Sequence, residues 1–488
     1  MSPRPAPRAA FIGENEARFD SGAVRPILCG MHRRGLSFAR LHLGLIFLLQ
    51  AIVAAGAAEK GAPQPSLSPL ERLSTTHLKK AHEDAARIQS ERRALPIPAG
   101  WHDYKAILHA HAEDSAHTGG TRPEMLTDAK KAGVEIIMLT DHLRPPRDFM
   151  DSWRGLHEGV LFIPGSEAKG FLVYPSGSVM DRMEAARPEL IAAVTAHDGL
   201  IFLSHIEERK DHPMDGLTGM EICNRHYDAK KDMAGLITIA MKLLDPAKLA
   251  ELQENVRLYP DEALATQVVY PQAYMTKWDT ETRARRLTGV AANDCHHNQI
   301  LVVKMVDKDT VLLGTNVDKD EDMHRFTAEG HPGIRTLTKG RQAGDIIAQV
   351  DFDPYFRSFR NMATHILAAE LSEASVRAAL QRGHAYVSHD WMCDATGFSF
   401  GLAGPEKRNE PIMGDEITFT GGQKLLARFP ASCYARLLRN GKEVAASDTR
   451  DFEYAPGEPG VYRIEGWLTL DGEKRPWIYS NPIYLREP

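Results

Sequence analysis

Histidine and carboxylate side chains recur where short apolar runs end in the middle of this 488-residue chain. Six runs end in or beside a group that could bind a metal ion; these groups are His109-Ala110-His111, Asp141-His142, Glu167, Ser204-His205, Glu221 to His226, and Asp294-Cys295-His296. Strand residues two apart share a face, so His109 and His111 can bind one ion or bridge two. Imidazole and carboxylate groups together suit zinc, manganese or iron. Because the set exceeds the needs of one tetrahedral ion, we expect two or three divalent ions.

The elements that carry these groups must all end on the same side. Between residues 97 and 392, short β-rich runs alternate with helical patterns, which is typical of an α/β fold. In α/β barrels the carboxyl ends of the strands converge on one face, where active sites form. We therefore expect a barrel-like domain over 97–392. A stretch near 227–286 interrupts it and forms either a lid or ordinary barrel helices.

The C-terminal part has a different pattern. From 393 to 488 helical periodicity gives way to short alternating runs, with turn pairs at Asn440-Gly441 and Asp471-Gly472. Such pairs predict hairpins, and the region predicts a small all-β sandwich.

The N-terminal residues predict export. Residues 1–57 hold an N-terminal extension followed, at about 31–57, by a basic stretch, an apolar run and Ala55-Gly56-Ala57, the pattern of a secretory signal peptide. We expect a periplasmic or secreted protein without a stable membrane span after cleavage; an uncleaved anchor is the alternative. Residues 58–96 predict a linker and one helix.

The charge of the chain limits the classes of binding partner that we expect. The formal net charge is -6, which argues against nucleic acid and favours a small-molecule substrate. The oligomeric state stays open. Cys393 and Cys433 could form a disulfide in an exported protein, but their spacing does not decide it.

The motifs resemble the polymerase-and-histidinol-phosphatase (PHP) superfamily of metal-dependent hydrolases over roughly residues 102–300. The resemblance rests on His109-x-His111, Ser115-x-His117, Thr140-Asp141-His142, Gly165-Ser166-Glu167, Ser204-His205 and Asp294-x-His296. It implies a distorted (β/α)7 barrel in which Glu167 bridges metal ions. The implied ligands are His109, His111, His117, His142, Glu167, His205, Asp294 and His296. A ninth ligand, for which His226 is the candidate, would complete a three-metal variant of the site.

The predicted C-terminal β-sandwich adds further reactions to those that the site could catalyse. A signal peptide, this barrel and a β-sandwich together look like exported PHP-type hydrolases, a branch that includes carbaryl-type carbamate hydrolases. A phosphoesterase is therefore the leading hypothesis, and a carbamate, ester or amide hydrolase with the same site is the alternative. A protein that only sequesters metal, or an adhesion protein, is the non-enzymatic alternative.

The expected mechanism uses a metal-bound hydroxide as the nucleophile. Asp294, or a nearby histidine such as His205, would pass a proton to the leaving group. Arg144 and Arg225 could reach an anionic group of the substrate, although both arginines could equally form surface salt bridges.

Overall fold

The computed structural model describes residues 62–225, 227–228, 232–402 and 410–488. The expected signal peptide and the candidate ligand His226 lie outside these residues. Within the described part of the chain, no helix is both long and apolar enough to cross a membrane.

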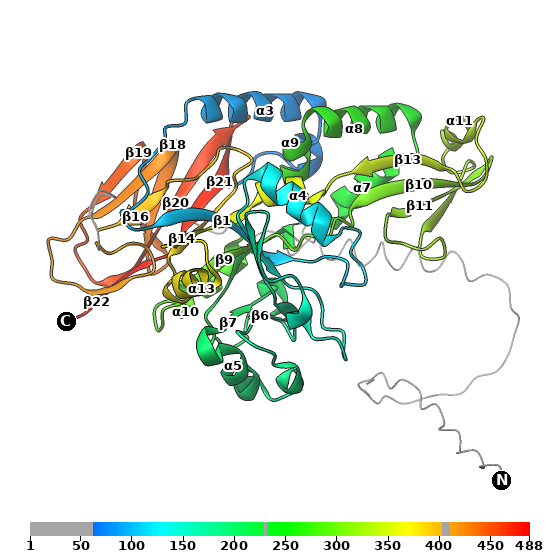
Figure 1. Cartoon of the computed structure of the whole chain (residues 1–488). Coiled ribbons are helices and arrows are strands. Elements are labelled where there is room, and N and C mark those ends of the chain that lie inside the picture. The colour runs from blue at the N-terminus through cyan, green and yellow to red at the C-terminus, as the bar shows by residue number, and fades with distance from the viewer. Residues whose placement is uncertain (1–61, 226, 229–231, 403–409) are drawn as a thin grey trace, which may run out of the picture. The chain divides into compact units, whose positions relative to one another are not determined.

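The strands that carry the candidate ligands lie in two sheets (Figure 1). In the first sheet three neighbouring strands run parallel, and they are β1 (His102–Ala110), β2 (Ile136–Leu139) and β4 (Val160–Ile163). The second sheet has five strands in chain order, and they are β5 (Ser166–Ala168), β6 (Phe171–Tyr174), β7 (Leu200–Leu203), β8 (Gly219–Asn224) and β9 (Thr288–Ala292). Within it β7, β8 and β9 are parallel, so the carboxyl ends of neighbouring strands meet at one edge.

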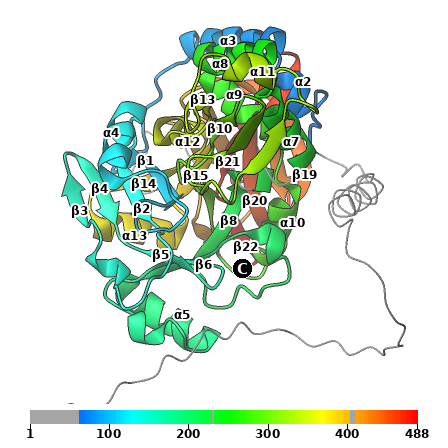
Figure 2. The same cartoon turned by 90° about the vertical axis from the view of Figure 1, so that its right-hand side faces the viewer.

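The two sheets meet beside the site without closing into the expected seven-stranded barrel. At one edge Ala110 forms a single parallel bridge to Cys295. At the other, the Glu167 N–H donates to the Thr140 carbonyl at 3.0 Å. Strand β3 (Gly155–His157) pairs antiparallel with β4 and occupies the edge that a barrel would need (Figure 2). The mixed α/β prediction is confirmed, whereas a closed barrel is not detected among the described residues.

Helices cover the sheets and fill the space between them. Their bounds are α2 (Pro69–Arg72), α3 (Thr75–Ser90), α4 (Arg122–Ala132), α5 (Arg187–Thr195), α7 (Met233–Lys242), α8 (Pro246–Leu258), α9 (Pro260–Leu264), α10 (Gln272–Glu281), α11 (Ile334–Thr338), α12 (Tyr355–Asn361) and α13 (Glu373–Arg382). Helices α4 and α12 pack against the first sheet, and α5 and α10 against the second. Apolar residues of α13 join a core shared by both sheets.

Local sequence explains where these helices begin and end. The Thr121 side chain caps α4 by accepting from the Glu124 N–H, and Gly133, with φ 69°, ends it. Glycine adopts this left-handed conformation without steric cost. The single helix expected near the N-terminus is two, because Ser74 takes an extended conformation between α2 and α3.

The C-terminal strands continue the first sheet. Strand β14 (Ala363–Ala368) pairs with β1, β15 (Ala385–Ser388) pairs with β14, and β21 (Glu473–Ser480) pairs with β15. The other strands of this part are β16 (Ser399–Gly401), β17 (Glu416–Thr418), β18 (Leu425–Arg439), β19 (Lys442–Tyr454), β20 (Gly460–Leu470) and β22 (Ile483–Arg486). The expected hairpin turns are present, with positive φ at Asn440, Gly441, Asp471 and Gly472. Cys393 and Cys433 are buried and free.

A third sheet was not predicted. It is antiparallel, follows β9 in the chain, and consists of β10 (Ile300–Asp307), β11 (Thr310–Thr315), β12 (His324–Thr327) and β13 (Ile346–Asp351). Its apolar residues share a core with α7, α8 and α11.

Candidate metal centre

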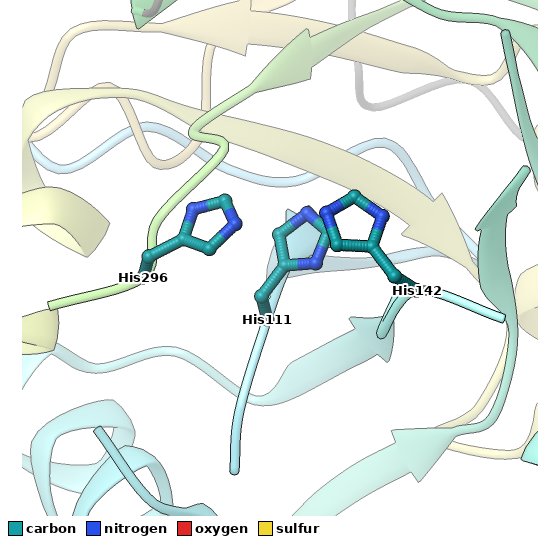
Figure 3. Close-up of side chains that lie close together, drawn as sticks. All are labelled: His111, His142 and His296. Carbon is teal, nitrogen blue, oxygen red and sulfur yellow. The ribbon is translucent and has the colours of Figure 1, made fainter. Parts of the chain in front are cut away.

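Two groups of side chains at the strand ends could each hold a metal ion. In the first, ligand atoms of His111, His142 and His296 lie within 4.8 Å of one another. In the second, His109, His111, Glu167 and Asp294 meet the same limit. Figure 3 shows the first group, whose three rings come together from segments that follow β1, β2 and β9. Because His111 belongs to both groups, the two positions adjoin.

Two carboxylates lie among the imidazole nitrogens. Asp294 Oδ1 lies 3.4 Å from the Nε2 atoms of both His109 and His111. Glu167 Oε2 lies 3.3 Å from His109 Nε2, and its Oε1 lies 3.0 Å from His205 Nε2. His205, which follows β7, therefore lies beside the second group through its contact with Glu167. Imidazoles and carboxylates at these distances form a donor set that could bind metal ions.

Three buried ring nitrogens point to metal binding. The Nε2 atoms of His109, His111 and His296 are buried and have no hydrogen-bond partner among the described residues. An unpaired buried polar atom costs about 1–3 kcal/mol. A metal ion accepts the lone pair of such a nitrogen and removes this cost. The residues present therefore fit divalent ions.

The other ring nitrogen of each histidine has a partner. His109 Nδ1 donates to Glu221 Oε1 at 2.7 Å, and His296 Nδ1 donates to the Asp294 carbonyl at 3.0 Å. His111 Nδ1 lies 3.2 Å from Ser115 Oγ. Burial opposes a charge on His109, but Asp294 and Glu167 raise its pKa well above the usual value. In the neutral form of each ring, which has one N–H and one lone pair, these bonds leave the lone pair on Nε2. Metal-binding histidines are commonly held this way.

The electrostatics differ between the two groups. Burial and the neighbouring His296 hold the pKa of His111 well below its usual value, and burial lowers the pKa of His296 to about 4. Both rings are therefore neutral and able to bind metal at pH 7. Burial opposes a charge on His205, but its hydrogen bonds to Glu167 and Glu207 raise its pKa to about 10.

The backbone at two site residues is in the left-handed region. His205 and Asp294 each have φ 48°, which is uncommon for residues other than glycine. Such conformations persist where the surrounding structure enforces them, and they are concentrated at functional sites. At His205 the enforcing contact is visible, because its N–H donates to Glu221 Oε2 at 2.8 Å.

Asp141 organises the turn that holds His111 and His142. Its Oδ1 accepts from the Ala112 N–H at 2.7 Å and from Ser115 Oγ at 2.9 Å. Ser115 Oγ in turn accepts from the His142 N–H at 3.0 Å. Arg122 donates to the other oxygen of Asp141 at 2.8 Å. Asp141 thus fixes the position of neighbouring candidate ligands.

Glu221 belongs to one of the strand-end groups expected to bind metal, but its role in orienting other candidate ligands was not predicted. It is completely buried on β8 and binds His109 Nδ1, the His205 N–H and, at 3.0 Å, Asn224 Nδ2. One carboxylate therefore orients two candidate ligands from different strands. The available signal was an acidic residue inside an otherwise apolar strand run.

Replacing Glu221 tests this positioning role. The Glu221→Gln variant keeps the size of the side chain but removes the charge that orients His109. We expect metal affinity to fall about 10–100-fold with an unchanged circular dichroism spectrum, since outer partners of metal ligands have effects of this size. Metal binding is measured by equilibrium dialysis with elemental analysis. Glu184→Gln, at a side chain that is 86% exposed, is the control. Unchanged metal affinity in Glu221→Gln would contradict the role.

Three further residues predicted for the site, His117, Arg144 and Arg225, differ in how they relate to the histidine–carboxylate cluster. The exposed His117 ring lies 4.5 Å from the His296 ring and 5.0 Å from the His142 ring, measured between centroids. The exposed Arg144 lines a small pocket beside His142. Arg225 is buried and donates to Gln299 Oε1 at 2.6 Å, so its side chain is engaged within the protein.

The fold and the site define a mixed α/β protein with a buried histidine–carboxylate cluster suited to metal ions. No protein-family model matches the chain, and no curated protein matches it. Among solved structures, the chain is similar to a two-domain protein from Bacteroides vulgatus that contains a predicted PHP-like metal-dependent phosphoesterase. The identity is 14%, the match covers 80% of this chain and 98% of the other, and the TM-score is 0.32.

Proposed function

We propose that this protein is a metal-dependent hydrolase of the PHP type, and in the first place a phosphoesterase. The observation that carries the proposal is the set of three buried Nε2 atoms that form no hydrogen bond in the described part of the chain, of which those of His109 and His111 lie 3.4 Å from Asp294 Oδ1. A purely structural cluster would pair these nitrogens with protein groups, because leaving them unpaired is costly.

The ligands divide between two adjoining positions. His109, His111, Glu167, Asp294 and His205 would hold one ion or a bridged pair. His111, His142 and His296 would hold another, with His117 and His226 as further ligands of a three-metal site. When bound, such ions supply an activated water and polarise the scissile P=O or C=O group.

The chain's own residues would orient the substrate and move its proton. Asp294 Oδ2 lies 3.6 Å from His205 Nε2, and Glu207 Oε1 lies 3.2 Å from His205 Nδ1. Where His205 is not itself bound to an ion, this Asp294–His205–Glu207 arrangement would deliver a proton from His205 Nε2 to the leaving group, as general acids do. The exposed Arg144, which lines the pocket beside His142, would bind the anionic group of the substrate.

The pocket beside His142 favours a phosphoester but also supports a second candidate. Arg144 and Arg147 both line it, and guanidinium groups recognise phosphate. Phe149 lines the same small pocket and gives its wall an apolar side chain beside the two arginines. Hydrolysis of aryl carbamates or esters is therefore the alternative activity. We also propose export, from the signal-like residues 31–57.

A substrate panel with controlled metal content tests the function. Mature protein would be assayed on aryl phosphate mono- and diesters, aryl carbamates and aryl esters, before and after chelation. We expect chelation to abolish hydrolysis, and zinc, manganese or iron to restore it, because the metal ions activate the water. Elemental analysis of the same samples counts the ions. Full activity in the metal-depleted protein would refute the proposal.

A further inference from the structure

One candidate ligand, His117, is held by a loop and not by the end of a strand. It lies in residues 111–121, which connect β1 with α4. Its ring is exposed, yet it lies 4.5 Å from the His296 ring, measured between centroids, at an interplanar angle of 29°. Loops are more mobile than the elements they connect, so contacts outside the ring must keep His117 in this place.

Three hydrogen bonds tie this loop to the segment that carries His296. The N–H groups of Gly119 and Gly120 donate to the His296 carbonyl at 3.0 and 3.3 Å. Asn298 Nδ2 donates to the His117 carbonyl at 3.0 Å. Of these three bonds, that of Asn298 is made by a side chain, so a substitution can remove it without changing the backbone.

The segment that carries Asn298 is itself fixed from outside the two sheets of the site. The Asp353 carboxylate, which follows β13 and is buried, accepts from the Gln299 N–H at 2.8 Å and from the Asn298 N–H at 3.3 Å. Asn316, directly after β11, donates to the His297 carbonyl at 3.0 Å. A buried carboxylate holds such N–H groups firmly, because leaving it without them is costly. The third sheet therefore braces the segment on which the loop rests.

We propose that Asn298 is a positioning residue that holds His117 over His296, as a ligand of the third ion. The position that this ion would occupy is formed by His111, His142 and His296. Ordering a free loop on binding costs conformational entropy, so a loop fixed beforehand binds the ion more tightly. The sheet of β10 to β13 thereby supports the site from outside it. The inference rests on the proposed function, since it concerns one of the ions of that site.

Zinc binding to the full chain tests the proposal. Metal-depleted protein would be dialysed against increasing Zn²⁺ and its metal content measured, with His117→Ala identifying the ion that depends on His117. We expect Asn298→Ala to weaken the binding of that same ion about tenfold, the effect of losing one hydrogen bond, and to leave the other ions in place. Unchanged binding of that ion in Asn298→Ala would overturn the proposal. So would a His117→Ala variant that loses no zinc, whereas a wild-type chain that binds no metal would refute the metal-dependent function as well.

A double variant separates positioning from a general loss of stability. If Asn298 acts through His117, the variant that combines His117→Ala with Asn298→Ala binds zinc no more weakly than His117→Ala alone, because the two effects share one contact. Additive losses would overturn the proposal. Gln423→Ala is the matched control, since its amide also donates to a backbone carbonyl, that of Thr418 at 2.9 Å, and it should bind zinc as the wild type does. Should Asn298→Ala fail to fold, Asn298→Leu, of similar size and without a donor, decides in its place.

Discussion

Replacing His111 with alanine should abolish hydrolysis and remove bound metal while leaving the fold intact. His111 is the residue common to both groups of candidate ligands, so its loss opens both positions. We expect activity to fall by more than about 1,000-fold, since even a single transition-state contact is worth about 100–1,000-fold. The rate on the best substrate of the panel and the metal content measure the effect.

Asp294 gives an independent version of the same experiment. Its φ of 48° is a conformation that asparagine tolerates better than alanine does, so Asp294→Asn removes the charge without added backbone strain. We expect the same loss of activity and metal. His324→Ala, at an exposed histidine on β12, controls for loss of an imidazole. Retention of full metal content by both site variants would show that the cluster is not the metal site.

The second prediction with a large expected effect concerns the stability of the C-terminal strands. Glu465 is fully buried on β20, where it accepts from Arg463 Nη1 at 2.5 Å and Arg436 Nη1 at 3.0 Å. Tyr270 and Trp467 also donate to it. The Glu465→Ala variant would leave two buried guanidinium groups without this shared partner. Breaking a buried ion pair in this way costs about 3–5 kcal/mol.

Urea unfolding followed by tryptophan fluorescence measures this loss. The exposed pair of Lys424 and Glu453 provides the control, because surface pairs contribute about 0–1 kcal/mol. We expect Glu453→Ala to unfold at nearly the wild-type urea concentration and Glu465→Ala at a much lower one. Similar midpoints for the two variants would show that the buried network contributes little.

The site could be predicted largely from local sequence. Histidines and carboxylates directly after apolar runs are visible because a strand end is a local feature, and parallel strands place such ends together. The structure does bring His109, His111, His142, Glu167, His205, Asp294 and His296 together. His226 lies outside the described residues, and the ligand roles of His117 and His226 stay proposals.

The fold could be predicted from the sequence less completely than the candidate site. The α/β class follows from the alternation of strand and helix patterns, and the C-terminal hairpins follow from Asn-Gly and Asp-Gly pairs. Whether the barrel closes depends on which strands pair at the two open edges of the sheets. A short apolar run predicts a strand, but it does not specify which other strand will pair with it. The sheet of β10 to β13 was missed for a similar reason, because its strands follow the last ligand motif inside a region expected to be α/β.

What the sequence determined by itself was the type of chemistry: imidazoles and carboxylates at strand ends, in an order that suits divalent ions. What only the tertiary structure decided was how those groups are held. Glu221 lies 112 residues from His109 and 16 from His205, yet binds both. Only the parallel pairing of β7 with β8, and the meeting of the two sheets, brings these groups within hydrogen-bond distance. Hydrogen bonds between residues far apart in the chain depend on packing, and local sequence patterns do not specify them.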